Sequence, residues 1–234
     1  MPVGINRRFV LKMSSNLKGK SPLERTAWKT AQSVWSIEAA SVRRLRETID
    51  PAAFTQCVKA IAECQGRVLI AGCGTSAAAA RKIAHSLCCI ERPALFLAPG
   101  DAMHGGLGLA QPADIAILIS KGGNTREIVN LLPPLKAKHV PIIGVTENPD
   151  SSVGRAADLL LRVKVEREPD EFNMLATAST MAVIAVFDAI CIALMKVTGY
   201  TRSQFAVIHP GGAVGERLLA KPRPLKSKKS PIRP

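Results

Sequence analysis

The chain has 234 residues, 47% hydrophobic and 4% aromatic, a composition that fits one sizeable α/β domain and excludes disorder throughout. Its net charge of +14 is concentrated at the ends: residues 1–20 contribute +5, residues 221–234 contribute +6, and the residues between carry only +3. We therefore predict two basic, disordered tails around a core without the charge pattern of a nucleic-acid-binding protein.

The first part of the core begins with two predicted helices, after which predicted strands and helices alternate. Ser21 followed by Pro22 is a typical helix start, and the helical pattern runs to about residue 49. Pro51 opens a second helix, which runs to about residue 64. The next predicted elements are a strand at 67–71, a helix at 75–89 and a strand at 94–98.

The second part continues the alternation. Its predicted elements are strands at 114–119, 141–145 and 158–165 and helices at 126–138 and 177–197. Pro133 and Pro134 should kink or break the first of these helices, and Gly199 ends the second. Short apolar runs that alternate with helices predict a parallel sheet with helices on both faces.

The cysteines indicate a reducing compartment. None of the six lies in a C-x-x-C pair, and Cys88, Cys89 and Cys191 fall in apolar helical patterns, where cysteine behaves as a small hydrophobic residue. We therefore expect a cytoplasmic protein without structural disulfides.

Neither an export signal nor a membrane span is expected. The pair Arg7-Arg8 resembles a twin-arginine signal, but the residues that follow are polar where such a signal is apolar. The most apolar segment, 181–195, is short for a span and contains Asp188, so a buried helix is the better interpretation.

Two loops at the predicted carboxyl edge of the sheet have the composition of phosphate-binding loops. The first, at 72–76, places Gly74, Thr75 and Ser76 at the start of a helix, whose free N–H groups favour an anion. Glycines in this position also begin dinucleotide sites. The second strand, however, ends at Pro99-Gly100 rather than at an acidic residue, which argues against such a cofactor.

The second loop, at 120–125, combines two glycines with hydroxyl and amide side chains, a mixture that suits a phosphate cradle. The ordinary alternative is a helix cap formed by Asn124 or Thr125. The spacing lacks the lysine-bearing pattern of nucleotide triphosphatases. The candidate ligand-binding residues of this loop are Ser120, Lys121, Gly122, Asn124 and Thr125.

Four segments, in this order and spacing, resemble the arabinose-5-phosphate isomerase branch of the SIS (sugar isomerase) family: 72–76, 99–108, 120–127 and 209–215. The H-G-x-L-G and H-P-G-G-A-x-G motifs within them are specific to that branch. The resemblance implies a flavodoxin-like three-layer sandwich with a five-stranded parallel sheet, formed here by a domain at 21–220. Many relatives append CBS modules, and the resemblance is to a short form without them.

The resemblance implies reversible aldose–ketose interconversion of a sugar phosphate through a cis-enediol. D-arabinose 5-phosphate and D-ribulose 5-phosphate, or a related pair, would be the substrates. It also implies a homotetramer with active sites at subunit interfaces and no redox cofactor, and no ligand spacing in the chain requires a metal.

The resemblance carries four catalytic residues onto this chain: His104, Glu127, Glu168 and His209. One base must remove the C2 proton, and an acid/base pair must move protons between O1 and O2. We expect Glu168 and His209 near these transfers and His104 in ring opening or binding. Two ordinary alternatives remain. Glu127 could simply be an acidic residue in the first turn of a helix, where the helix dipole favours negative charge, and Glu168 could be a surface residue in the charged run 166–168.

The sequence departs from the family at three positions. Relatives usually carry lysine where this chain has Thr75, serine where it has Gly122, and asparagine where it has Lys121. We hypothesise that Lys121 supplies the displaced positive charge. The departures suggest a different substrate in the same reaction class, and they leave open a catalytically weak, regulatory sugar-phosphate-binding protein. A further alternative is a sugar-phosphate lyase or epimerase that uses the same pocket.

Overall fold

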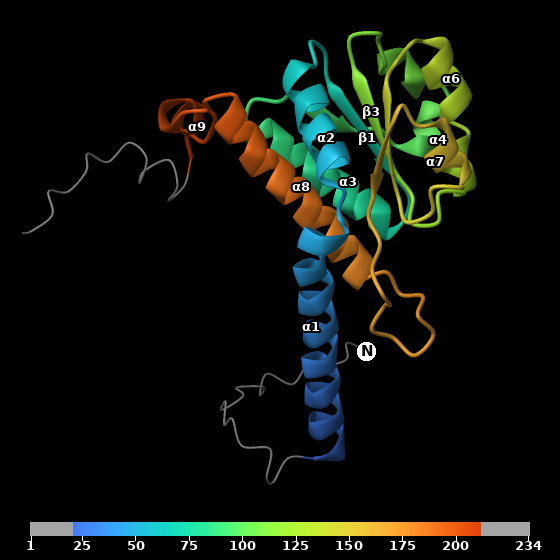
Figure 1. Cartoon of the computed structure of the whole chain (residues 1–234), viewed down its shortest axis with the longest axis vertical. Helices are drawn as coiled ribbons and strands as arrows, with labels where there is room; N and C mark the ends of the chain where they lie inside the picture. Colours follow the sequence, from blue (N-terminus) through green and yellow to red (C-terminus); the bar gives the residue numbers. More distant parts are fainter. Residues whose placement is uncertain (1–20, 212–234) are drawn as a thin grey trace, which may run out of the picture.

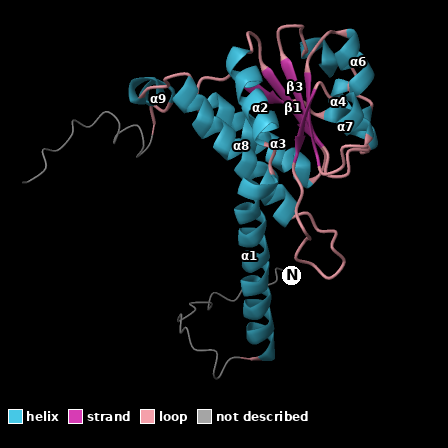
Figure 2. Cartoon of the chain, in the orientation of Figure 1, coloured by secondary structure: helices cyan, strands magenta, loops and turns pink. Residues whose placement is uncertain are grey.

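The computed structural model describes residues 21–211 and is built around one parallel sheet (Figure 2). The sheet has five strands in the order β2-β1-β3-β4-β5. The strands are β1 (Val68–Gly72), β2 (Ala94–Phe96), β3 (Ile115–Ile119), β4 (Ile142–Thr146) and β5 (Leu159–Arg162). Helices cover both faces, so the predicted flavodoxin-like three-layer sandwich is confirmed.

Helices α1, α2, α3 and α8 lie on one face, and α4 to α7 lie on the other (Figure 1). Each face of the sheet packs against its helices in a separate hydrophobic core, and alternate residues of each central strand point into one core or the other. Ile70 and Ile117 pack in the first core, and Leu69 and Leu118 pack in the second. The helices of the described residues are α1 (Pro22–Thr48), α2 (Pro51–Glu63), α3 (Thr75–Cys88), α4 (Pro99–Ala102), the 3-10 turn η1 (Gly106–Leu109), α5 (Arg126–Val129), α6 (Leu132–Ala137), α7 (Ser152–Ala156), α8 (Ala178–Val197) and α9 (Arg202–Ile208).

The strand order places a topological switch point between β1 and β3. The chain leaves β1 towards β2 on one side and leaves β3 towards β4 on the other. Loops that leave adjacent strands in opposite directions open a crevice beyond the carboxyl ends, where open α/β sheets bind ligands. The two loops singled out in the sequence, at 72–76 and 120–125, follow these two strands.

Helix α8 forms the middle of the first helical layer. It packs against α1 and α3, and Phe187 and Ile190 are fully buried. Among the described helices it alone has the length and hydropathy of a membrane span, yet its Asp188 forms an ion pair with Lys82 of α3. It serves as a core helix, as predicted, although Ile192 remains exposed on its outer side.

Helix α1 begins with the predicted cap. The Ser21 side chain accepts from the backbone N–H of Glu24, the Glu24 carboxylate accepts from the backbone N–H of Ser21, and Pro22 occupies the first helical position. The N-terminal half of the helix projects away from the body (Figure 1). Trp28 and Trp35 contact each other edge to face there and remain 44% and 55% exposed.

The predicted break of the 126–138 helix at Pro133 and Pro134 is confirmed, because this segment forms the two short helices α5 and α6. Other details differ from the predictions. Strand β5 ends at Arg162, three residues before the predicted end. Cys88, predicted as apolar packing, is exposed. All six thiols are free, and burial raises the pKa of Cys57 to about 12. The predicted tails and the last part of the predicted domain, 212–220, lie outside the described residues.

Candidate functional site

The loop after β1 is shaped by two glycines. A Cβ on Gly72 would lie 2.6 Å from the backbone oxygen of Ser76, so a side chain there would collide with the start of α3. Gly74 precedes the helix with a φ of +56°, a conformation that favours glycine. The turn leaves Thr75 exposed at the first position of α3 and Ser76 partly buried beside it.

The loop after β3 is held by its own hydroxyl groups. Ser120 is buried; its Oγ accepts from the backbone N–H of Gly123 at 3.1 Å and lies 2.8 Å from Oγ1 of Thr125. Gly123 has a φ of +71°, and a Cβ there would lie 1.9 Å from Oγ of Ser151. If Ser120 donates to Thr125, the Thr125 proton remains available for a ligand oxygen.

Two other loop residues have different surroundings. Asn124 Oδ1 accepts from the backbone N–H of Ser152 at 2.9 Å, which ties the loop to the start of α7. The Asn124 side-chain oxygen is therefore engaged within the fold. Gly122 is exposed, and a Cβ added at this position would have no atom within 4 Å, so the serine of the relatives would fit without steric conflict.

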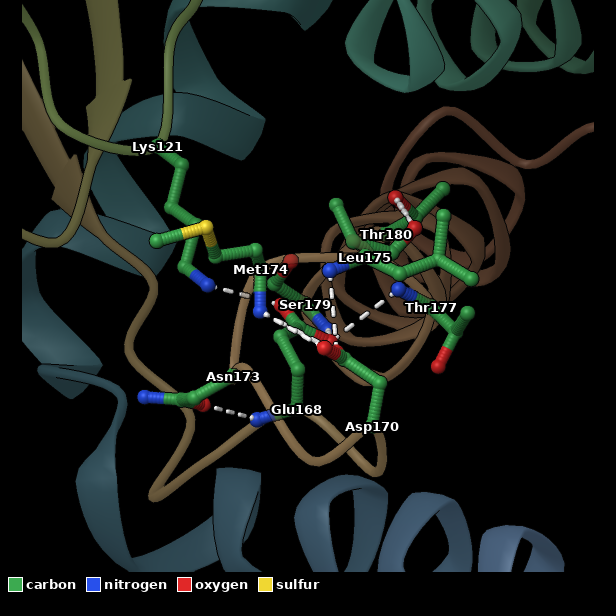
Figure 3. A network of polar contacts seen from close by, with 10 residues as sticks. Lys121, Glu168, Asp170, Asn173, Met174, Leu175, Thr177, Ser179 and Thr180 are labelled. Carbon is green, nitrogen blue, oxygen red and sulfur yellow. Dashed lines mark hydrogen bonds and ion pairs between the residues drawn. The ribbon is translucent and has the colours of Figure 1, made fainter.

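Lys121, from the same loop, reaches across the carboxyl edge to Glu168, which follows β5. Its Nζ lies 2.7 Å from Oε1 of Glu168 (Figure 3). The other carboxylate oxygen accepts from the backbone N–H groups of Thr177 at 3.0 Å and Ser179 at 3.3 Å, at the start of α8. A carboxylate at a helix N-terminus is favoured by the helix dipole.

Glu168 is fully buried, which contradicts the alternative of a surface position in a charged run. Burial alone would raise the pKa of this carboxyl. Hydrogen bonds from Lys121, from Ser179 and from the backbone of Thr177 outweigh burial, and the pKa lies below its ordinary value. Glu168 is therefore a carboxylate at neutral pH, with both oxygens already bound to donors.

The segment before α8 forms a hydrogen-bonded loop that holds Glu168 in place, because Oδ1 of Asn173 accepts from the backbone N–H of Glu168. The Asp170 carboxylate accepts from the backbone N–H groups of Phe172, Met174 and Leu175, and Figure 3 shows the contacts with Met174 and Leu175. These hydrogen bonds lower the pKa of Asp170 although desolvation opposes them. The loop exposes three large apolar side chains, 78% of Phe172, 81% of Met174 and 63% of Leu175.

The structure adds ligand-binding candidates that the sequence reasoning missed. Ser179 and Thr180 of α8 line a narrow cavity together with Ser76 and Lys121, at the carboxyl edge of the sheet. Nearby, Oγ1 of Thr177 is buried and has no hydrogen-bond partner among the described residues. The signal available in the sequence was the hydroxyl-rich stretch at 177–180, directly before the apolar helix.

Glu127 and His104 also lie at the carboxyl edge, on the side of α4 to α7. Glu127 is in the first turn of α5, and its charge, after burial, raises the pKa of the Cys73 thiol, which places it near the loop after β1. His104 is exposed in the turn between α4 and η1. Because α4 packs against α5, these two residues belong to neighbouring elements.

His209 does not join this group within one chain. The start of α8 lies at Glu168, and the 20 residues of the helix, at about 1.5 Å each, carry the chain roughly 30 Å away. Helix α9 follows there, and Gln204 donates to Glu91 at the far end of α3. Figure 1 shows α9 at the opposite end of α8 from the loop that follows Glu168.

His209 directly follows the last residue of α9, and its ring packs back against this helix. Its ring stacks on Phe205 with 3.9 Å between the ring centroids, and Nδ1 lies 2.9 Å from the Phe205 carbonyl oxygen. If Nδ1 donates to that carbonyl, Nε2 is the nitrogen left to act on a ligand. Of the predicted catalytic residues, the chain thus brings three to the carboxyl edge and leaves His209 remote.

Comparison with known proteins agrees with this architecture. Residues 61–193 match the SIS domain family, more than half of the chain, and the chain belongs to this family. Arabinose 5-phosphate isomerase KdsD of Escherichia coli (strain K12) is 42% identical over 168 residues, which cover 72% of this chain and 51% of that protein. The chain thus spans about half the length of the curated relatives it matches.

Two solved structures match over their full lengths and cover 82% of this chain. A candidate sugar-phosphate isomerase from Listeria monocytogenes is 53% identical, with a TM-score of 0.80. The Escherichia coli CFT073 protein c3406, solved in complex with arabinose 5-phosphate, is 30% identical, with a TM-score of 0.76.

Proposed function

We propose that the chain is an aldose–ketose isomerase of sugar phosphates that works through a cis-enediol. The substrate pair would be D-arabinose 5-phosphate and D-ribulose 5-phosphate or a close relative. The observation that carries the proposal is the arabinose 5-phosphate complex of c3406, because this chain covers that protein fully and places phosphate-type loops at its own switch point. The arabinose 5-phosphate isomerases among the curated relatives support the same reaction.

The phosphate group would bind where the two loops meet the start of α8. Gly74, Thr75 and Ser76 would offer backbone and hydroxyl donors from one side, and Ser179 and Thr180 from the other. From the loop between them, the backbone at Gly122 and Asn124 and the hydroxyls of Ser120 and Thr125 complete the proposed cradle. A ligand oxygen would also give the buried Thr177 hydroxyl a partner.

Lys121 would supply the cation that Thr75 cannot. Within the chain, its charge is neutralised by Glu168 at 2.7 Å. A phosphate dianion is a competing acceptor for the same ammonium group. Withdrawal of Lys121 towards the phosphate would free Oε1 of Glu168, so that substrate binding itself would prepare this carboxylate for proton transfer.

The reaction needs a base that removes the C2 proton of the aldose and returns it to C1, while a second group moves the proton between O1 and O2. Of the four residues that the resemblance implies, Glu127 and Glu168 are the carboxylates, both at the carboxyl edge, and His104 lies on a neighbouring element. We assign proton transfer at carbon to one of the two glutamates, and transfer between the oxygens and ring opening to the histidines.

His209 would reach the site from another copy of the chain. The roughly 30 Å that separate the two ends of α8 exclude a direct role for it at Glu168 of its own chain. An exposed half-helix with two tryptophans and an exposed apolar loop at 172–175 are surfaces that a partner could cover. We therefore propose a homotetramer with shared active sites, located in the cytoplasm, where six free thiols stay reduced.

The experiment is incubation of the purified protein with D-arabinose 5-phosphate and a panel of other aldose and ketose phosphates in D₂O, followed by proton NMR. Interconversion with loss of the C2 proton signal would support an enediol isomerase and identify its substrate. Epimers or cleavage products would instead indicate an epimerase or a lyase. A Lys136→Ala variant, altered at an exposed position of α6, serves as the matched control.

One observation favours a second candidate function. Thr75 does not carry the positive charge of the lysine that relatives usually have at this position, and Lys121 is already paired with Glu168. This arrangement would suit a protein that binds a sugar phosphate without converting it. In that case, D-arabinose 5-phosphate would raise the melting temperature by mass action while no substrate of the panel was converted. Failure of both turnover and stabilisation would refute the sugar-phosphate assignment.

A further inference from the structure

A second concave site lies apart from the switch point, between the C-terminal half of α1 and the segment that follows β5. Its volume is about 680 Å³, within the range of about 300–1,000 Å³ that is typical of small-molecule sites. Figure 1 shows α1 leaving the body beside this segment. The charged residues that line the groove are Arg44, Arg162, Lys164, Glu166 and Arg167.

The groove is strongly basic in a core that is nearly neutral. Four cations and one carboxylate give its lining a net charge of +3, whereas the whole of residues 21–220 carries only +3. Glu166 pairs with Arg44, and Arg162 Nε donates to the backbone oxygen of Glu147 at 3.2 Å. Within residues 21–211, the side chains of Lys164 and Arg167 make no ion pair or hydrogen bond.

The backbone adds further donors. Strand β5 is the last in the sheet, so its outer edge is unpaired. The N–H of Val163 donates to the Thr146 oxygen at 3.1 Å, towards β4. Because neighbouring residues of an extended chain point their N–H groups to opposite sides, those of Arg162 and Lys164 face the open edge. An anion in the groove would thus meet both cationic side chains and free N–H groups.

We propose that this groove is a binding site for a nucleoside diphosphate. A diphosphate carries a charge of about −3 near neutral pH, which complements the lining, whereas a monophosphate leaves part of it unbalanced. Ile37, Ala40 and Val165 provide apolar wall for the base and ribose. The charge also argues against a second copy of this chain as the occupant, since both its core and its ends are basic.

The site is placed to influence the carboxyl edge. Arg167 precedes Glu168 in the chain, so a ligand that fixes Arg167 acts on the segment that positions the Lys121–Glu168 pair. Only this coupling rests on the proposed isomerase function. Binding to the groove is independent of turnover and is measured separately.

The test is isothermal titration of the full-length protein with ADP, GDP, CDP and UDP, and with the four matching monophosphates and inorganic phosphate for comparison. We expect saturable binding of at least one diphosphate, at one site per chain and weakened by salt. The affinity of the matching monophosphate should be lower than that of the diphosphate by a factor of about ten or more. The double variant Lys164→Ala/Arg167→Ala should lose at least about tenfold in affinity, and Lys136→Ala none.

Several results would overturn the proposal: no binding of any of the four diphosphates, unchanged affinity in the double variant, or competition with saturating D-arabinose 5-phosphate, which would place the nucleotide at the carboxyl edge. A double variant with unchanged nucleotide affinity but a smaller assembly would identify the groove as a subunit contact. Normal binding in a protein without isomerase activity would leave the groove site standing and refute only the proposed function.

Discussion

Replacement of Glu168 by glutamine tests whether the buried carboxylate holds the carboxyl edge together. The substitution keeps the volume, but its NH₂ group must face either the Lys121 ammonium or the backbone N–H groups of Thr177 and Ser179, all of which are donors. Lost charged hydrogen bonds of this kind are worth about 1.5–3 kcal/mol, and removal of one partner from a buried pair about 3–5 kcal/mol. Because the Lys121 side chain is 35% exposed and can be solvated again, we expect about 2–3 kcal/mol.

The effect should depend on pH in a defined direction. The pKa of Glu168 is lower in the folded chain than its ordinary value of 4.5. As the pH falls, the unfolded chain therefore takes up a proton first, and the stability contributed by the carboxylate is present above that value and lost below it. The difference in unfolding free energy between wild type and Glu168→Gln should stay nearly constant as the pH falls from 7 towards 4.5, and should narrow as the pH falls further.

The assay is urea unfolding at several pH values and one fixed protein concentration, because association stabilises the folded form. Lys121→Ala should cost about 2–3 kcal/mol, because it leaves the buried Glu168 carboxylate without its cation, and the double variant should show coupling between the two positions. A loss below about 0.5 kcal/mol for Glu168→Gln, typical of a surface substitution, would refute the reasoning. So would a loss that stays constant as the pH falls below 4.5.

Three further predictions concern the loops and the shared site. Gly123→Ala should destabilise by about 3 kcal/mol in urea unfolding, because a Cβ would lie 1.9 Å from the Ser151 hydroxyl at a positive φ; an unchanged midpoint would contradict this. Thr75→Lys should tighten D-arabinose 5-phosphate binding about tenfold in titration calorimetry, and no gain would mean that Lys121 already fills that role. His209→Ala and Glu127→Gln should each be inactive alone, whereas co-expression should restore up to about a quarter of the activity; no restoration would exclude shared sites.

The sequence by itself determined the layered architecture. Strand-length apolar runs separated by helical patterns and turn residues fix which segments are strands, and buried strands on both faces require helices on both sides. Local signals also fixed the start of α1 at Ser21 and Pro22 and the break between α5 and α6 at two prolines. These caps and breaks depend on interactions between residues close together in the chain, so the local sequence is sufficient to predict them.

The tertiary structure decided the chemistry around Glu168. Lys121 and Glu168 are 47 residues apart, and only the pairing of β3, β4 and β5 brings their loops to one edge. The charged run around Glu168 suggested exposure, but the turn built on Asp170 folds this carboxylate onto the start of α8. The position of His209 was decided by the direction of α8. Sequence spacing does not encode such directions, because they follow from the packing of whole elements.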